Sequence, residues 1–145
     1  MIPVRKLVDL FGADRVNTDR LEHLCYSRDM SVHRGIPEAI VTPTSTAMVA
    51  ELLGLASREG FAVIARGAGS SVTGAVLPVK PSVICDMCRM NRILRISHED
   101  RFAVVEPGVV CQDLNTALAP RAFFAPDPGS STVATIGGMV ATNAS

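Results

Sequence analysis

The chain has 145 residues, 48% of them hydrophobic, which is enough to build one core of ordinary domain size. Its 14 basic and 14 acidic residues leave a formal net charge of zero and no basic block, which argues against nucleic acid or an anionic membrane surface as a partner. No apolar run approaches the roughly 18 residues of a membrane span, and no signal-type apolar block follows the first residues, so we expect a cytoplasmic protein.

Four cysteines include one C-x-x-C pair, Cys85 and Cys88, so a redox or zinc site has to be weighed. Cys85 falls inside an apolar run, and no second close pair or nearby histidine completes a zinc set. We therefore expect both residues to be small core side chains. The histidines His23, His33 and His98 are scattered, and we assign no metal site.

Two short helices are predicted before residue 30. Apolar residues recur at helical spacing over residues 3–11. Thr18 or Asp19 can cap a second helix that runs through Leu24. Residues 26–29, Tyr-Ser-Arg-Asp, are predicted to be irregular, with charges that serve structure rather than chemistry.

A strand, a helix and a second strand follow. The buried run Ala39–Thr42 predicts a strand, and the hydroxyl residues Thr44–Thr46 can cap a helix that runs to Glu59. Gly60 ends this helix, and Phe61–Ala65 returns as the second strand. Two strands joined in this way are expected to run parallel.

The remainder predicts a third strand over Ser82–Met87, a hairpin of runs 93–97 and 102–106, and a helix over Cys111–Leu118. Thr135 can cap a last helix of small residues. The expected fold class is α+β. A βαβ subdomain with short parallel strands and flanking helices is followed by the start of a second, antiparallel α+β subdomain.

The stretch Ala65–Ala75 directly follows the second strand and holds three glycines and three hydroxyl residues. Glycine permits positive φ and close approach to the backbone, so the N–H groups of Gly67 to Ser71 can converge on a phosphate. In an open α/β sheet this end of a strand is the usual ligand side. Taken alone, the same stretch could equally be a flexible loop.

Two familiar phosphate loops fail against this stretch. A dinucleotide fingerprint starting at Gly67 needs its third glycine at position 72, which is Val72, and the two prolines that follow prevent the required helix. A P-loop aligned on Gly69 and Gly74 lacks its lysine and its Mg²⁺-binding hydroxyl. A second hydroxyl-rich, glycine-containing cluster at 126–144 suggests that both clusters serve one elongated ligand.

These residues resemble a known family, the FAD-linked oxidases and dehydrogenases with a p-cresol methylhydroxylase-type (vanillyl-alcohol-oxidase-type) FAD-binding domain. The nearest branch resembles the glycolate oxidase D subunit and D-lactate dehydrogenase group. The resemblance rests on the order and spacing of Tyr26–Asp29, Arg66–Gly69 with Gly74, Asp86, Arg89–Ile93, Val104–Gly108 and the second cluster through Asn143–Ala144.

The resemblance implies that residues 1–35 are an N-terminal helical segment and residues 36–145 an FAD-binding domain that is incomplete at its C-terminal end. FAD should be held without a covalent bond, because a serine stands where some relatives carry a linking histidine. Arg66 is ambiguous, since it could balance phosphate charge or be an ion-pair partner. The implied cofactor-binding residues are Arg66, Gly67, Ala68, Gly69, Ser70, Ser71, Gly74, Pro126, Asp127, Ser130, Ser131, Thr135, Gly137, Gly138 and Asn143.

The resemblance further implies oxidation of a small 2-hydroxy acid, similar to glycolate or D-lactate, to a 2-oxo acid. Electrons would pass on to another acceptor, for which an iron–sulfur subunit is a candidate. No catalytic residue is assigned, because the family places the substrate groups in a further domain, and this chain alone is expected to be inactive. The alternatives are a non-catalytic FAD- or nucleotide-binding module completed by another chain, and an interaction domain without flavin.

Overall fold

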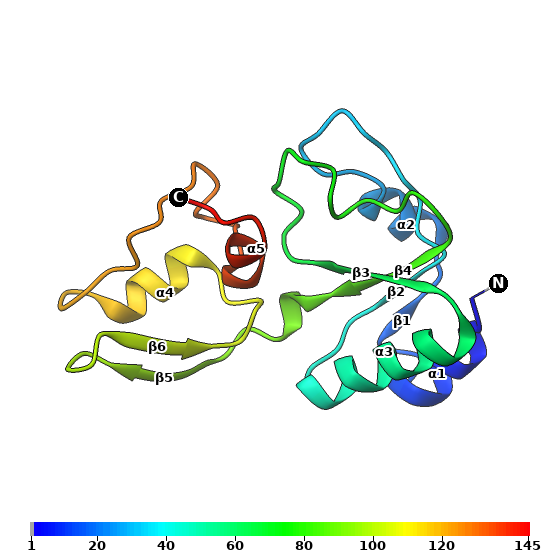
Figure 1. Cartoon of the computed structure of the whole chain (residues 1–145), viewed down its shortest axis with the longest axis horizontal. Helices are drawn as coiled ribbons and strands as arrows, with labels where there is room; N and C mark the ends of the chain where they lie inside the picture. Colours follow the sequence, from blue (N-terminus) through cyan, green and yellow to red (C-terminus); the bar gives the residue numbers. More distant parts are fainter. Residues whose placement is uncertain (1) are drawn as a thin grey trace.

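The computed structural model describes residues 2–145, which form two lobes joined by a short 3-10 turn (Figure 1). The first lobe contains α1 (Val4–Phe11), β1 (Val16–Asn17), α2 (Arg20–Tyr26), β2 (Ala39–Val41), α3 (Thr46–Glu59), β3 (Ala62–Arg66) and β4 (Ser82–Asp86). The turn η1 (Met87–Arg89) leads to the second lobe, with β5 (Ile93–Ser97), β6 (Phe102–Val105), α4 (Cys111–Leu118) and α5 (Ile136–Ala141). The predicted α+β class is confirmed.

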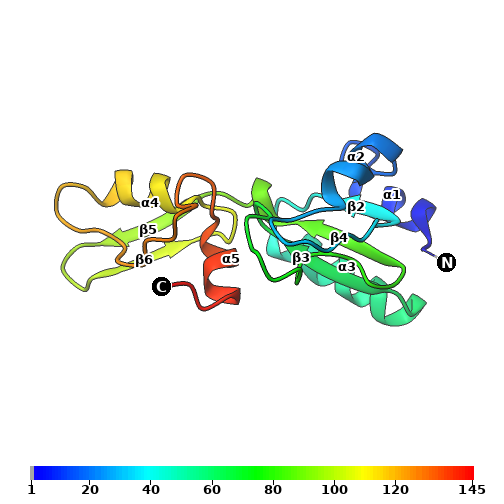
Figure 2. The ribbon, with the colours of Figure 1, turned by 90° about the horizontal axis from the view of Figure 1, so that it is seen from above.

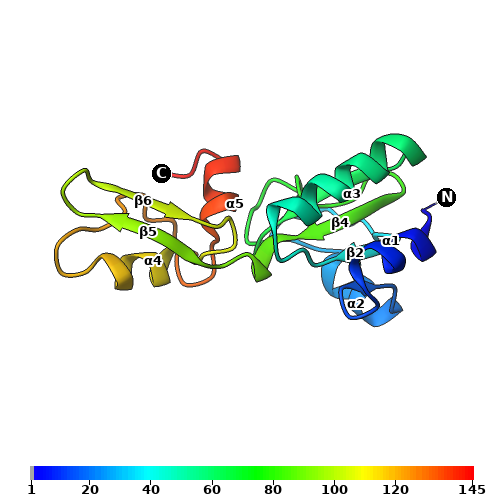
Figure 3. The same cartoon turned by 90° about the horizontal axis from the view of Figure 1, so that it is seen from below.

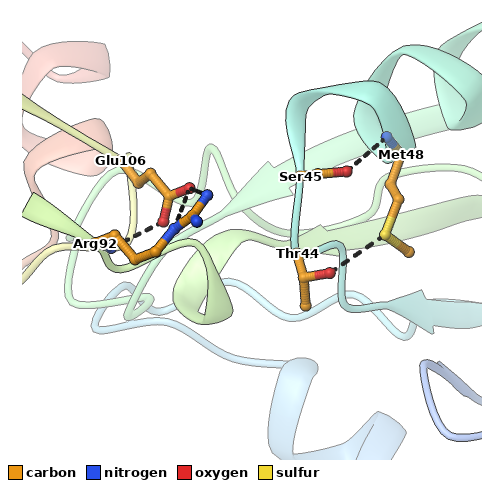
Figure 4. Close-up of polar contacts among 5 residues, drawn as sticks. All are labelled: Thr44, Ser45, Met48, Arg92 and Glu106. Atoms are coloured by element: carbon orange, nitrogen blue, oxygen red, sulfur yellow. Dashed lines mark hydrogen bonds and ion pairs between the residues drawn. The ribbon is translucent and has the colours of Figure 1, made fainter. Parts of the chain in front are cut away.

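Local signals start and end the helices of the first lobe. The Ser45 hydroxyl accepts a hydrogen bond from the N–H of Met48 at 3.3 Å, which caps α3 (Figure 4). Gly60 ends the same helix in the left-handed conformation, with φ of 73°. Asp19, one of the two predicted caps, begins α2 and accepts from the N–H of Leu21 at 2.7 Å.

The four-stranded sheet of the first lobe has the order β1-β2-β4-β3. Both β2 and β3 run parallel to β4, which lies between them. The two strands joined by α3, β2 and β3, are therefore parallel as predicted, but they are not neighbours, because the connection through α3 passes over β4. The sequence did not indicate β1, which pairs antiparallel to β2 through Val16 and Val41. Two residues are too few to show a period.

Alternation along the buried strands directs one set of side chains toward α1 and α3. Because α1 shares this core with the sheet, the N-terminal helix is an integral part of the first lobe. Figures 2 and 3 show α2 on the opposite side of the sheet from α3. The buried cluster consists of Ile2, Leu7, Phe11, Val16, Ala39, Val41, Leu52, Leu55, Val83 and Cys85.

The two cysteines of the C-x-x-C pair lie at the end of β4 and in η1. Cys85 is buried in the core, as predicted, and burial raises its pKa to about 11. Cys88 is half-buried, and burial together with the nearby Asp86 carboxylate raises its pKa to about 12. Both thiols are therefore protonated at neutral pH and are weak nucleophiles. Within residues 2–145, no group of three or more His, Cys, Asp or Glu side chains is placed to hold a metal.

The second lobe packs its hairpin and two helices around a separate core. α4 spans the residues predicted for it, and Thr135 caps α5 by accepting from the N–H of Gly138 at 3.4 Å. The N–H of Ile136 donates to Val109 at 2.8 Å, which ties the start of α5 to the entry of α4. The core residues are Val109, Cys111, Leu114, Leu118, Ala134, Ile136 and Met139.

The joint between the lobes is formed by η1 and the segment after β6. The Glu106 carboxylate, which is only 8% exposed, accepts from the Arg92 N–H at 2.8 Å and from Arg92 Nη2 at 2.7 Å (Figure 4). The N–H of Gly108 donates to the Met90 carbonyl at 2.7 Å. A Cβ on Gly108 would overlap the Met87 carbonyl oxygen, so only glycine fits here. This joint fixes the second lobe against the end of β4.

The Glu106 contact predicts an acid-side loss of stability. Hydrogen bonds from the Arg92 side chain and backbone hold the pKa of Glu106 below its usual range. A lowered pKa contributes stability above the unfolded value of about 4.3 and loses it as pH falls through the folded pKa. The gap in urea midpoint between wild type and Glu106→Gln should therefore be largest at neutral pH and close toward about pH 3. The urea midpoint of the control Glu99→Gln, in the exposed hairpin turn, should follow that of wild type at each pH. A gap between wild type and Glu106→Gln that does not change with pH would contradict a stabilising role for the Glu106 carboxylate.

Candidate functional site

A cleft of about 750 Å³ lies between the two lobes. One wall is the glycine loop (residues 67–75), which leaves β3 at its carboxyl end. The other wall is the second cluster (residues 126–144), which includes α5. Figure 1 shows α5 facing the end of β3 and the loop that follows it. Two segments far apart in the sequence thus share one hollow.

The two walls approach each other closely at Gly67 and Thr135, and this approach requires glycine. A Cβ built on Gly67 would overlap Oγ1 of Thr135, so the absence of a side chain at Gly67 lets the lobes close on each other. Ten of the fifteen residues proposed from the sequence line the cleft. They are Arg66, Gly67, Ala68, Gly69, Ser70, Ser71, Ser130, Thr135, Gly137 and Gly138.

The glycine loop presents unused donors. Within residues 2–145, none of the backbone N–H groups of Ala68, Gly69, Ser70 and Ser71 donates to another residue. Gly69 has φ of 68°, which is favourable only for glycine and turns the chain so that successive amides change direction. Free amides beside a cleft are suited to hydrogen-bond an anion.

Several backbone amides of the second cluster already donate hydrogen bonds within the protein. The N–H of Gly137 donates to the Pro107 carbonyl at 2.8 Å, and the N–H groups of Ser131 and Ala134 donate to Pro128 at 2.8 Å and Ser130 at 2.7 Å. This wall therefore contributes shape and small side chains more than free donors. A Cβ on Gly137 would lie 2.6 Å from Cβ of Pro107, so this glycine is needed for packing.

Five of the predicted residues lie away from the cleft lining, namely Gly74, Pro126, Asp127, Ser131 and Asn143. The N–H of Gly74 is already bonded to the Asp29 carboxylate at 2.9 Å, so it is not available to a ligand. Asn143 is exposed with φ of 49° just after α5. The sequence could not separate these residues from the lining ones, because motif membership says nothing about which way a group points.

Arg66 lies at the floor of the cleft and is 8% exposed. Its Nη2 donates to the Arg28 carbonyl at 2.8 Å, and its guanidinium stacks over the Tyr26 ring at 5.2 Å. Within residues 2–145 it makes no ion pair, so the ion-pair alternative for Arg66 is wrong. A Cβ on Gly69 would overlap this guanidinium, which therefore sits directly behind the loop.

Tyr26 is a residue that sequence reasoning left without a role. Its hydroxyl donates to Oδ2 of Asp86 at the end of β4, and burial followed by this hydrogen bond raises its pKa above the ordinary range. The ring therefore stays neutral and holds Arg66 by its face. Asp86 accepts at its other oxygen from the N–H of Cys88 at 2.9 Å. No local signal could have paired residues that are 60 positions apart.

The chemistry of the lining is limited to binding. Among the described residues, the cleft lining contains no Asp, Glu, His, Lys, Cys or Tyr; it holds one arginine, several hydroxyls and small apolar side chains. Such a surface can bind an anionic group and an apolar one, but it offers no ordinary general base.

Fold and cleft together define an α+β nucleotide-binding domain, with a glycine loop at the end of a parallel strand and a second lobe that closes over it. The family model described as "FAD binding domain" matches residues 37–145. The chain belongs to this FAD binding domain family, and its cofactor is FAD. The resemblance to the p-cresol methylhydroxylase-type FAD-linked oxidoreductases is confirmed.

Curated relatives are much longer than this chain. It is 40% identical over 133 residues to D-2-hydroxyglutarate dehydrogenase of Escherichia coli (strain K12), covering 88% of this chain and 13% of that protein. It is 29% identical over 140 residues to glycolate oxidase subunit GlcD of Bacillus subtilis (strain 168), covering 95% and 30%. The chain thus spans 30% or less of either relative.

Solved structures share the fold. A structure of alkyldihydroxyacetonephosphate synthase superposes with a TM-score of 0.88 at 28% identity, covering 97% of this chain and 29% of that one. p-Cresol methylhydroxylase with substrate bound gives 0.84 at 24% identity, covering 94% and 28%, and shows the fold alone. No helix in residues 2–145 has the length and apolar character to cross a bilayer.

Proposed function

We propose that the cleft holds the FAD pyrophosphate on the free amides of the glycine loop, with the second cluster as the opposite wall. The observation that carries this proposal is the contact between Gly67 and Thr135, which puts a wall of unused N–H donors and a wall of small side chains around one hollow. Its volume of about 750 Å³ is within the roughly 300–1,000 Å³ of small-molecule sites. On this proposal the ten lining residues make the direct contacts with FAD.

Arg66 supplies the positive charge of this site. Its guanidinium is buried without a carboxylate partner, which is unfavourable unless an anion balances it. The pyrophosphate of FAD provides that anion across Gly69. Arg66 therefore acts through the low dielectric behind the loop, where a charge has more effect than at the surface.

FAD is held without a covalent bond on this proposal. A protein link to the flavin ring needs a nucleophilic side chain, and the cleft lining among residues 2–145 holds no histidine, cysteine or tyrosine. The binding domain proper begins near residue 36, at the entry to β2. Residues 2–35, with α1, β1 and α2, then form an N-terminal, mainly helical segment that packs onto it, and the matched range 37–145 supports this division.

For the whole protein we propose oxidation of a small 2-hydroxy acid to a 2-oxo acid. Relatives named glycolate oxidase subunit and D-2-hydroxyglutarate dehydrogenase support this substrate class. Bound FAD would accept the two electrons, and an iron–sulfur subunit is a candidate for the next carrier. The base for the hydroxyl and the clamp for the carboxylate would come from outside this chain, since the described lining holds neither.

The chain loaded with FAD should keep its flavin but turn over slowly. After gel filtration in low salt, the protein should carry visible flavin absorption. With glycolate, D-lactate or D-2-hydroxyglutarate and an artificial electron acceptor, turnover should stay below about 1 per second, because ordinary enzymes reach that rate with a placed base. Loss of all flavin on the column would overturn the binding function. Turnover at the ordinary rate would show that the cleft contains a catalytic group after all.

A further inference from the structure

Residues 26–30, here called the positioning segment, lie along the glycine loop although they precede the residues matched by the family model. Oδ2 of Asp29 accepts the N–H of Gly74 at 2.9 Å, and its Oδ1 accepts the N–H of Ser31 at 2.8 Å. The N–H of Met30 donates to the Ser71 carbonyl at 3.1 Å. The part of the loop from Ser71 to Gly74 is thus fixed at both ends by a segment more than 40 residues earlier in the chain.

A second set of contacts fixes the start of the loop, near Arg66 and Gly69. Arg66 donates to the carbonyls of Arg28 at 2.8 Å and Tyr26 at 3.5 Å, and its guanidinium lies behind Gly69. The Tyr26 hydroxyl is bonded to Asp86 at the end of β4. The positioning segment is therefore anchored to the sheet at one end and to the loop at the other.

The inner part of the loop has little else to hold it. Its amides from Ala68 to Ser71 donate to no other residue in the described chain, and its internal hydrogen bonds lie farther along, where the hydroxyls of Ser71 and Thr73 bond to each other at 2.8 Å and accept the N–H groups of Thr73 and Ala75. A loop with so few internal contacts would sample many conformations, and a ligand would then lose affinity by having to order it. An external clamp removes this cost.

We infer that Asp29 is a positioning residue of the flavin site, which holds the glycine loop in the shape that binds phosphate by accepting the N–H of Gly74. This inference rests on the proposed function of the cleft. Burial alone would favour the neutral acid, but the hydrogen bonds from Ser31 and Gly74 outweigh it and lower the pKa of Asp29, so the carboxylate is the form that clamps the loop.

The test compares three variants in FAD titrations and in amide hydrogen exchange of the flavin-free protein. Asp29→Ala removes the clamp. Asp29→Asn keeps an oxygen that can accept from Gly74 and removes a negative charge near an anion site. Asp19→Ala is the matched control, because the Asp19 side chain also accepts two backbone N–H groups in the N-terminal segment, but both belong to α2 and neither to the glycine loop.

Asp29→Ala should weaken FAD binding about tenfold or more and speed exchange of the Gly74 amide about tenfold, since one hydrogen bond to a charged group is lost. Asp29→Asn keeps the acceptor for Gly74 but places an NH2 group where Oδ1 accepts from Ser31, so it should bind FAD more tightly than Asp29→Ala. Asp19→Ala should lower the urea midpoint and leave both readouts near wild type. Wild-type affinity or unchanged Gly74 exchange in Asp29→Ala would overturn the inference, as would failure of Asn to restore binding. If wild type binds no FAD while Gly74 exchange still depends on Asp29, the proposed function falls and the clamp stands.

Discussion

Replacing Gly69 with valine is expected to abolish measurable FAD binding. Gly69 has φ of 68°, which a β-branched residue strongly disfavours, and a Cβ there would overlap the Arg66 guanidinium. The variant must move the loop or the arginine, and either change misplaces the donors for the pyrophosphate. Each lost charge-assisted contact is worth about 1.5–3 kcal/mol, so affinity should fall at least about 100-fold.

The matched control for this variant is Gly60→Val. Gly60 also has positive φ, at 73°, but a Cβ there would meet nothing within 4 Å, and the residue ends α3 outside the cleft. Both variants carry a left-handed backbone penalty of roughly 1–2 kcal/mol. FAD titration and urea unfolding of the flavin-free proteins separate the effects. Equal FAD affinity in Gly69→Val and Gly60→Val would mean that the phosphate lies elsewhere.

Gly108→Val should give a large loss of stability. A Cβ on Gly108 would overlap the Met87 carbonyl and lie 2.8 Å from the Met90 carbonyl, and these backbone atoms cannot rotate away. The hydrogen bond from the Gly108 N–H to Met90, at 2.7 Å, would break as well. We expect a decrease of about 3 kcal/mol or more in the free energy of unfolding, measured by urea titration.

The same substitution should also weaken FAD binding, because the joint holds the second wall against the glycine loop. Gly54→Ala should change the free energy of unfolding in the opposite direction. Gly54 lies inside α3, and a Cβ there would meet only the flexible end of Arg58 at 3.3 Å, so alanine should stabilise the protein by about 0.5–1 kcal/mol. A Gly108→Val protein with wild-type stability would show that the joint can rearrange.

Elements marked by local chemistry could be predicted from the sequence. Ser45 and Gly60 start and stop α3, and α4 spans the residues that its spacing indicates. The position of β4 between β2 and β3 could not be predicted, because no local signal says which strands become neighbours. β1 could not be predicted for a simpler reason, because two residues are too few to show a pattern.

The candidate site was predictable in outline only. Two glycine-rich clusters indicated one ligand, and the structure brings them together at Gly67 and Thr135. The surroundings of Arg66 and Gly74 depend on contacts with residues 38 to 45 positions away, which a motif cannot show. A side chain at Gly69 would overlap the guanidinium of Arg66, a contact that no motif indicates.

The central claim, that both walls serve one dinucleotide, is tested most directly by equilibrium titration with FAD and with FMN in the same buffer. FMN carries the flavin and one phosphate but lacks the second phosphate and the adenosine. Because each added charge-assisted contact contributes about 1.5–3 kcal/mol, FAD should bind at least about tenfold more tightly than FMN. Equal dissociation constants for FAD and FMN would contradict a site in which the two walls share one dinucleotide.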